Sequence, residues 1–328
     1  MHTALFKELA GAAFRNEPVA LGIISRVKGS SPQKVGAKAV FYADGRIQGT
    51  MGGGCLEAEI QQRAIQSLRT GKAATFELLL DHDFGWDDGL ICGGKVFGVI
   101  LPNAQSVGQR FWSELNERKS TIRWGVKSDF SIAPTSGLSG MEIPIGGRVK
   151  SPFPNGWLYQ ETVFPPCALW IAGAGHIAQA VAPLAHQLDF AVTVFDDRPA
   201  LVNRHYFADD ISLKADPWEK LLEARLPDVP SFALIVTRGH RHDALVLKDW
   251  VHKPFLFLGM IGSSRKARTI FEHFKEEQIA TERELERVAC PVGLNIRSQT
   301  VPEISVSIMA QFIQMRAELV TPHTRILA

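Results

Sequence analysis

The sequence predicts an α/β protein of two domains, and two patterns support this. In the C-terminal half, short apolar runs alternate with amphipathic helical stretches, as in a doubly wound parallel sheet. In the N-terminal half, strand-like runs outnumber helical ones, which indicates a mixed α/β domain. We expect a first domain over residues 1–103, a connector with some strand content over residues 104–164, and a second domain over residues 165–328.

The composition excludes several classes of protein. The chain has 328 residues, of which 45% are apolar, and a net charge of +2, so it can build two cores and offers no bulk charge to nucleic acid or an anionic membrane. Four cysteines are too few for a disulfide scaffold and suit a reducing compartment. With no secretory leader and no apolar run of about 18 residues, we expect a cytoplasmic protein without a membrane span.

The first domain is predicted to begin with an amphipathic helix over residues 3–16. A second helix is expected to run from Cys55 to about residue 69, because the apolar spacing there becomes helical and Gly71 follows. The expected strands of this domain are residues 19–27, 38–42, 46–48, 75–80 and 95–101.

Three consecutive glycines, at positions 52–54, connect a strand to the second helix and place Cys55 at the helix start. The helix dipole and free N–H groups there favour a thiolate. Cys92 has a similar setting, so a large ligand is expected to approach the backbone closely; the alternative is that the glycines serve turns and the thiols fill apolar space. The candidate ligand-binding residues are Gly52, Gly53, Gly54, Cys55, Cys92, Gly93 and Gly94.

The second domain alternates strands and helices more clearly. Its expected strands are residues 167–172, 190–195, 232–236 and 255–258. Its expected helices are residues 176–188, 218–225, 243–251, 265–277 and 302–319.

A glycine fingerprint, G-x-G-x-x-A, follows the first of these strands. Gly173 permits the turn, Gly175 lets a pyrophosphate reach the backbone, and Asp196 ends the next strand, where it can bind a ribose. This predicts a Rossmann-like fold. Binding of NAD(P) or another nucleotide is a weaker expectation, because the fold can persist without it and His176 projects toward the phosphate position.

Two further loops are expected at the same edge of the sheet. Gly262, Ser263, Ser264 and Arg265, followed by Lys266, combine a glycine turn, hydroxyls and cations, which suits a phosphate. The alternative is an ordinary serine-capped helix with solvated basic side chains.

The other loop spans residues 237–243. Its His240, His242 and Asp243 make only a weak metal motif, because no further ligand stands at a fixed spacing. We expect the polar side chains of this loop to face a nucleotide crevice. The alternative is that Asp243 simply caps a helix.

With these motifs the sequence resembles the XdhC/CoxI family of accessory proteins of molybdenum hydroxylases such as xanthine dehydrogenase. The N-terminal half carries VKGSSPQKVGAKAVFYADGRIQGTMGGGCLEAE and GLICGGKVFGVI, and the C-terminal half carries LWIAGAGHIAQAV, VFDDRP, GMIGSSRK and CPVGLNIRSQTVPEISVSIMA. The resemblance implies that the protein binds and protects the molybdenum cofactor (molybdopterin) and helps load its sulfurated form into a hydroxylase. It also implies contact with a cysteine desulfurase.

The resemblance implies roles for two thiols. Cys55 stands where many members have a cysteine and some a histidine, and Cys92 stands in a second Cys-Gly-Gly segment. Because molybdenum favours sulfur donors, both are candidate metal ligands. We therefore expect a cofactor chaperone or insertion factor rather than a turnover enzyme. The sequence leaves open whether the protein forms a homodimer.

Two other functions remain as alternatives. One is an NAD(P)-dependent oxidoreductase that uses the Rossmann crevice with Cys55 as a redox thiol. The other is a thiol–disulfide switch between Cys55 and Cys92, which requires Cα atoms within about 7 Å.

Overall fold

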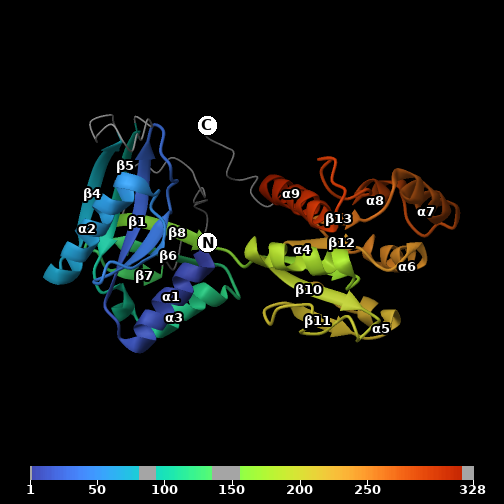
Figure 1. The fold of residues 1–328 in the computed structure, drawn as a ribbon, viewed down its shortest axis with the longest axis horizontal. Helices are drawn as coiled ribbons and strands as arrows, with labels where there is room; N and C mark the ends of the chain where they lie inside the picture. The colour runs from blue at the N-terminus through green and yellow to red at the C-terminus, as the bar shows by residue number, and fades with distance from the viewer. Residues whose placement is uncertain (1, 81–93, 135–155, 320–328) are drawn as a thin grey trace. The chain divides into compact units, whose positions relative to one another are not determined.

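A computed structural model describes residues 2–80, 94–134 and 156–319 of the chain (Figure 1). The chain divides into two compact units after Pro165. Unit 1 precedes this point and unit 2 follows it.

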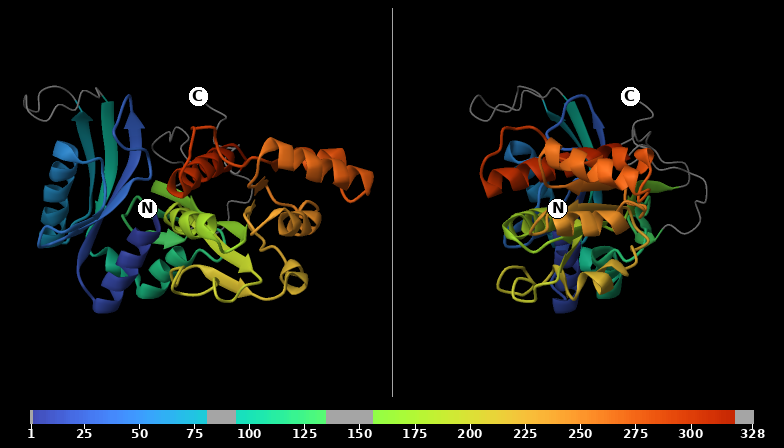
Figure 2. Two further views of the ribbon diagram at one scale, coloured as in Figure 1. Left: turned by 45° about the vertical axis from the view of Figure 1, so that its right-hand side comes forward. Right: turned by 90° about the vertical axis from the view of Figure 1, so that its right-hand side faces the viewer.

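Unit 1 is built on a five-stranded sheet in the order β3-β2-β1-β5-β4, whose neighbouring strands pair antiparallel. The strands are β1 (Val19–Lys28), β2 (Lys38–Tyr42), β3 (Ile47–Gly49), β4 (Ala74–Leu80) and β5 (Gly94–Leu101). Helix α2 (Gly54–Thr70) lies along one face and buries Leu56, Ile60 and Ala64 against it (Figure 2). These three positions share one face of a helix, which is the spacing that predicted α2.

The other face of this sheet is covered by helices and by a second sheet in the order β7-β6-β8. The elements are α1 (His2–Arg15), η1 (Ala104–Val107), α3 (Gln109–Glu117), β6 (Ile122–Lys127), β7 (Ile132–Pro134) and β8 (Trp157–Val163). Phe6 of α1 stacks on Trp112 of α3 and meets Trp124 of β6 edge-on, and all three rings are fully buried. The described part of segment 104–164, expected as a connector, thus contributes to the core of unit 1.

Unit 2 is built on a six-stranded sheet in the order β11-β10-β9-β12-β13-β14, with all pairs parallel. The strands are β9 (Cys167–Ala172), β10 (Phe190–Asp196), β11 (Ser212–Ala215), β12 (Ser231–Ile235), β13 (Phe257–Met260) and β14 (Val288–Ala289). Counted along the unit, this is the order 3-2-1-4-5-6 of the Rossmann fold. The predicted doubly wound parallel sheet is confirmed.

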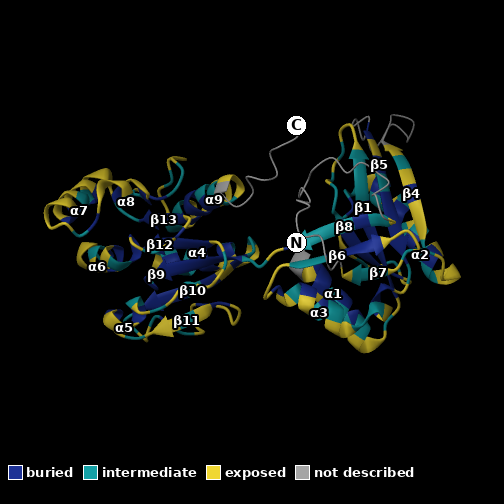
Figure 3. Ribbon diagram, turned by 180° about the vertical axis from the view of Figure 1, so that it is seen from behind, coloured by how far each residue is buried: buried dark blue, intermediate teal, exposed yellow. Residues whose placement is uncertain are grey.

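Helices cover both faces of this sheet. The helices are α4 (His176–Gln187), α5 (Trp218–Leu222), α6 (His240–Trp250), α7 (Ser264–Glu276), α8 (Glu282–Glu286) and α9 (Val301–Leu319). Leu169 and Ile171 of β9 pack in one core with α4 and α9, while Trp170 and Ala172 pack in a second core with α5, α6, α7 and α8. Because both faces are covered, β9 and β12 are buried along their whole length (Figure 3).

The longest helix among the described residues is α9, with 19 residues. It buries Ile308, Met309 and Phe312 in the first core of unit 2 and carries charged residues at Glu303 and Arg316. Throughout residues 2–80, 94–134 and 156–319, no helix combines the length and the apolar character needed to cross a bilayer.

Candidate functional site

The glycine turn of unit 1 needs glycine for its backbone. Gly52, Gly53 and Gly54 have φ angles of 124°, 72° and 54°, in the left-handed region that other residues rarely adopt. A Cβ atom at Gly53 or Gly54 would meet nothing within 4 Å. The turn therefore also leaves open space beside the backbone.

Helix α2 begins at this turn without a cap. No side chain caps it at Gly53, and no described residue accepts a hydrogen bond from the N–H of Gly54 or Cys55. Cys55, half-buried, stands in this first turn as predicted. A thiol, free N–H groups and the positive end of a helix therefore lie next to open space.

The carboxylate of Glu57 is hydrogen-bonded to the loop that precedes the glycine turn. Glu57 accepts hydrogen bonds from the Thr50 hydroxyl at 2.9 Å and from the Met51 N–H at 2.8 Å. The Thr50 hydroxyl in turn accepts the Gly52 N–H at 3.1 Å. Glu57 is thus bonded to the loop that precedes Cys55 and fixes its shape.

Gly52 and Gly94, from the two glycine segments of unit 1, both lie against the loop of residues 29–33. A Cβ at Gly52 would lie 3.1 Å from Cγ of Pro32, and a Cβ at Gly94 would overlap the carbonyl oxygen of Ser30. The described ends of both segments therefore flank the same loop, as the prediction of one shared ligand site requires. Cys92 and Gly93 lie outside the described residues, so their predicted role remains a prediction.

Within the described ranges, no group of three or more His, Cys, Asp or Glu side chains is placed to hold a metal ion. The weak metal motif of His240, His242 and Asp243 is therefore not assembled. Among the described residues of unit 1, Cys55 offers a soft donor at the uncapped start of α2.

In unit 2 the two fingerprint glycines have different surroundings. A Cβ at Gly173, where φ is +111°, would overlap the carbonyl oxygen of Val236 and lie 2.9 Å from Cα of Thr237. A Cβ at Gly175 would meet nothing within 4 Å. Gly173 therefore lets β9 approach the loop after β12, while Gly175 borders open space at the start of α4.

Asp196, the predicted ribose acceptor, is already bonded. It is 1% exposed, and its carboxylate accepts the Ala174 N–H at 2.7 Å and the guanidinium of Arg198 at 2.7 and 2.8 Å. Burial alone would raise the pKa of Asp196, but the bonds from Arg198 and Ala174 outweigh it and hold the pKa below its usual value. Asp196 thus anchors the glycine loop, and its binding of a ribose remains a prediction.

An ion pair crosses the carboxyl end of β9. Arg238, after β12, donates to both oxygens of Asp197, after β10, at 3.2 and 2.9 Å. Because β9 lies between β10 and β12, this pair spans the point where the glycine loop begins. The ring of His242 lies 2.8 Å from the Arg238 guanidinium.

The loop after β12 is shorter than predicted, because α6 begins at His240 rather than near Asp243. Asp243 accepts the N–H and hydroxyl of Thr237 at 3.1 and 2.6 Å, and it also pairs with Lys266. These bonds close the loop, so His240 and His242 stand in the first turn of α6. Asp243 is consequently a buried structural carboxylate.

In the loop of residues 262–266, one of the side chains predicted to bind phosphate has a structural role instead. The Ser263 hydroxyl accepts the Lys266 N–H at 3.2 Å and so caps α7, as the serine-cap alternative proposed. Ser264 and Arg265 are exposed, as is His176 in the first turn of α4. Among the residues predicted to bind phosphate here, Ser264 and Arg265 are those whose side chains point to solvent without a structural bond.

Sequence reasoning did not single out Cys290. This thiol follows the two-residue strand β14 and lies beside Gly262, where a Cβ would be 3.4 Å from its Sγ. The segment Cys290–Gly293 was part of the family resemblance. The preceding strand β14 has only two residues, so no periodic pattern in the sequence predicts a strand there or the position of Cys290 after it. A thiol following a strand in a doubly wound sheet is the signal that would have found it.

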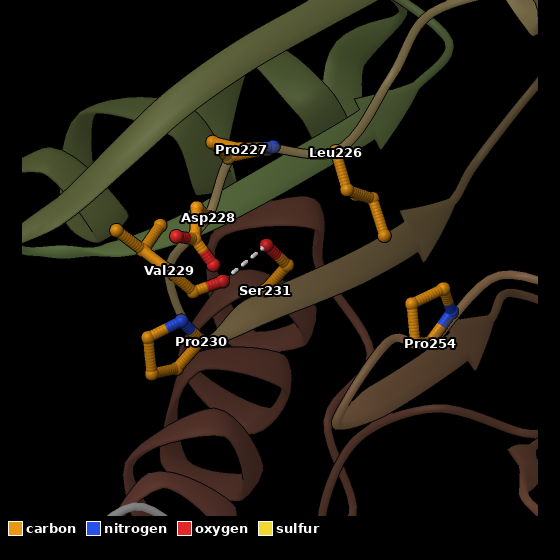
Figure 4. A pocket seen from close by; sticks show the side chains of 7 residues that line it. All are labelled: Leu226, Pro227, Asp228, Val229, Pro230, Ser231 and Pro254. Atoms are coloured by element: carbon orange, nitrogen blue, oxygen red, sulfur yellow. Dashed lines mark hydrogen bonds between the residues drawn. The ribbon is translucent and has the colours of Figure 1, made fainter.

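A cavity of about 340 Å³ lies beside the start of β12 (Figure 4). Its lining includes Pro227, Asp228, Ser231 and Pro254, and the Ser231 hydroxyl donates to the Val229 carbonyl at 2.8 Å. Ser231 begins β12, so the cavity is at the amino ends of the strands. It is therefore separate from the carboxyl ends of the strands, where this fold binds ligands.

Two family models match the chain. The model described as the XdhC and CoxI family matches residues 12–79, which include the Gly52–Cys55 turn. The model described as the XdhC Rossmann domain matches residues 169–312, which include the loops at the carboxyl edge of unit 2.

Curated relatives are similar over most of the chain. The uncharacterized protein YqeB of Escherichia coli is 25% identical over 95% of this chain, which spans only 46% of the length of YqeB. A Bacillus subtilis protein described as a probable xanthine dehydrogenase subunit is 24% identical, with 92% of this chain and 94% of the relative covered. The molybdenum cofactor insertion chaperone PaoD of E. coli is 24% identical, with 96% and 89% covered.

A solved structure shares the fold. The crystal structure of a xanthine dehydrogenase from Bacillus halodurans has a TM-score of 0.78 over 100% of both chains, at 24% identity. This similarity supports the same arrangement of elements in both proteins.

Proposed function

The chain belongs to the XdhC and CoxI family, and we propose that it is an accessory protein that binds the molybdenum cofactor for a xanthine dehydrogenase-type hydroxylase. Two relatives with near-complete coverage support this proposal by their names, one a molybdenum cofactor insertion chaperone and the other a probable component of xanthine dehydrogenase.

The glycine turn of unit 1 is the observation that carries the proposal. The N–H groups of Gly54 and Cys55, which no described residue accepts, suit the phosphate of a pterin cofactor, and a Cβ at Gly53 would meet open space where the cofactor could approach. The thiol of Cys55 supplies the soft donor that molybdenum prefers. Cys92 and Gly93 join the proposed site by their place in the sequence motif.

An open site of this kind suits a carrier. A cage of four protein ligands would saturate the metal and resist release, whereas one or two thiols hold the cargo and leave positions for exchange. We propose that the cofactor is sulfurated with a cysteine desulfurase as partner and is then delivered to the hydroxylase.

Unit 2 favours a supporting role over nicotinamide chemistry. The Rossmann strand order and the open space at Gly175 fit a nucleotide, but Asp196 is bonded to Arg198, and the Arg238–Asp197 pair crosses the glycine loop. A dinucleotide would have to displace these bonds. The start of α4 at Gly175 is therefore better suited to a small anionic group than to NAD(P).

The test is the cargo itself. Wild-type protein purified from a molybdate-fed host is expected to retain molybdenum and a fluorescent pterin after gel filtration. A parallel titration with NADH and NADPH is expected to give no turnover. Stoichiometric reduced nicotinamide with turnover, and no pterin, would support the oxidoreductase alternative instead.

A further inference from the structure

Cys290 and Lys266 both lie beside Gly262, at the carboxyl ends of the strands of unit 2. Cys290 follows β14, and Lys266 stands in the first turn of α7, after β13. A Cβ at Gly262 would lie 3.4 Å from Sγ of Cys290 and 3.5 Å from Nζ of Lys266. Because position 262 is a glycine, it places no side chain of its own between the thiol and the ammonium.

The ammonium of Lys266 is fixed in this place. It pairs with Asp243, which is 1% exposed, and donates to the Ile261 carbonyl at 3.1 Å. Asp243 is held in turn by the N–H and hydroxyl of Thr237. These bonds link the loops after β12 and β13 and hold the ammonium beside Gly262, on which the Cys290 thiol also borders.

The thiol of Cys290 is half-buried. Burial raises the pKa of Cys290, the Lys266 ammonium opposes this, and Asp243 adds to it. The unmodified group is therefore a protonated thiol. A more acidic sulfur group on the same side chain would ionise and gain an ion pair with Lys266.

We propose that Cys290 is a sulfane-sulfur acceptor and that Lys266 stabilises the persulfide anion it carries. The proposal rests on the proposed function, because cofactor sulfuration provides a protein persulfide as donor. The Cys290 sulfur attacks the terminal sulfur of the donor, a new S–S bond forms at Cys290, and the S–S bond of the donor breaks. The donor leaves as a thiol with the proton that Cys290 loses, so no net oxidation occurs.

The experiment uses the full-length reduced protein and inorganic polysulfide as the sulfur source. Peptide mass spectrometry is expected to find one added sulfur on Cys290, removable by dithiothreitol. Cys290→Ser is expected to carry none at that peptide. Cys167, 6% exposed at the amino end of β9, serves as the internal control and is expected to stay unmodified in the folded protein.

The role of the charge is tested by matched variants of neighbouring cations. Lys266→Met is expected to shorten the lifetime of the Cys290 persulfide several-fold, while Lys266→Arg and Arg268→Ala, at an exposed cation of the same helix, keep it. An unmodified Cys290 in folded wild-type protein, under conditions that modify Cys55 or Cys92, would overturn the proposal. An equal lifetime in Lys266→Met would remove the stabilising role of Lys266.

Failure here and failure of the proposed function are distinguishable. Pterin retention is measured on wild type and Cys290→Ser without polysulfide, and both are expected to retain it because Cys290 lies outside the glycine turn of unit 1. Loss of pterin from both would overturn the carrier function and leave the labelling result standing. Normal retention without labelling would overturn the sulfur acceptor alone.

Discussion

The two glycine turns of the molecule start helices in the same way but differ in how far their polar groups are satisfied. At Gly52–Cys55 the helix start is uncapped, the N–H groups of Gly54 and Cys55 have no described acceptor, and the thiol borders open space. At Gly173–Gly175 the helix start is also uncapped, but Asp196 already binds the Ala174 N–H.

This difference shows that a glycine motif at a helix start can serve either as a structural turn or as an open candidate binding site. In unit 2, Asp196, which a dinucleotide site would use for the ribose, is bonded to Arg198. The neighbouring carboxylates Asp197 and Asp243 are bonded to Arg238 and Lys266. These bonds stabilise the loops as a scaffold. In unit 1 the only carboxylate bonded to the turn, among the described residues, is Glu57, which holds the loop and leaves the helix start open.

The largest expected effect on stability comes from replacing Gly173 with alanine, compared with the same change at Gly175. Gly173→Ala would force a side chain into left-handed backbone and into the Val236 carbonyl, so we expect a loss of about 3 kcal/mol in the free energy of unfolding of unit 2. Gly175→Ala meets open space and is expected to change it by less than about 1 kcal/mol. Hydrogen exchange of β9 and β12 measures both, and equal losses would contradict the contrast.

A smaller effect is expected at Asp196. Asp196→Asn removes the ion pair with Arg198 and should cost about 2 kcal/mol in the free energy of unfolding at pH 7. Because the folded-state pKa of Asp196 is lowered, its contribution is present above the unfolded value near 3.9 and is lost as the pH falls below it.

Urea unfolding of both proteins at pH 7 and near pH 3 tests this. The difference between wild type and Asp196→Asn is expected to shrink at the lower pH. A constant difference at both pH values would mean that the charge of Asp196 does not stabilise the glycine loop.

Much of the fold could be predicted from local sequence patterns. Apolar runs such as Cys167–Ala172, and the fingerprint after them, sufficed for the parallel sheet, because its strands are buried on both faces. The packing of Trp112 and Trp124 on Phe6 could not be predicted, because these contacts join positions far apart in the sequence that no periodic pattern links.

The candidate site was predictable in part for a similar reason. Residue type and spacing placed Cys55 at a helix start and Asp196 at a strand end. Whether a polar side chain is available to a ligand depends on its partners in the folded chain. Lys266 and Asp243 come from different loops, so their pairing could not be predicted from local sequence. Cys290 was missed because β14 has two residues and no periodicity.

The central claim, that the open turn of unit 1 holds the cofactor through Cys55, is tested most directly by a matched pair of serine variants. Cys55→Ser removes the soft donor from a half-buried position, whereas Cys167→Ser alters a buried thiol in β9. Molybdenum and pterin are measured per protein after gel filtration, together with the midpoint of thermal unfolding. We expect Cys55→Ser to lose most of the cofactor at an unchanged midpoint and Cys167→Ser to keep the cofactor at a lowered midpoint. Full retention of molybdenum and pterin by Cys55→Ser would contradict the account.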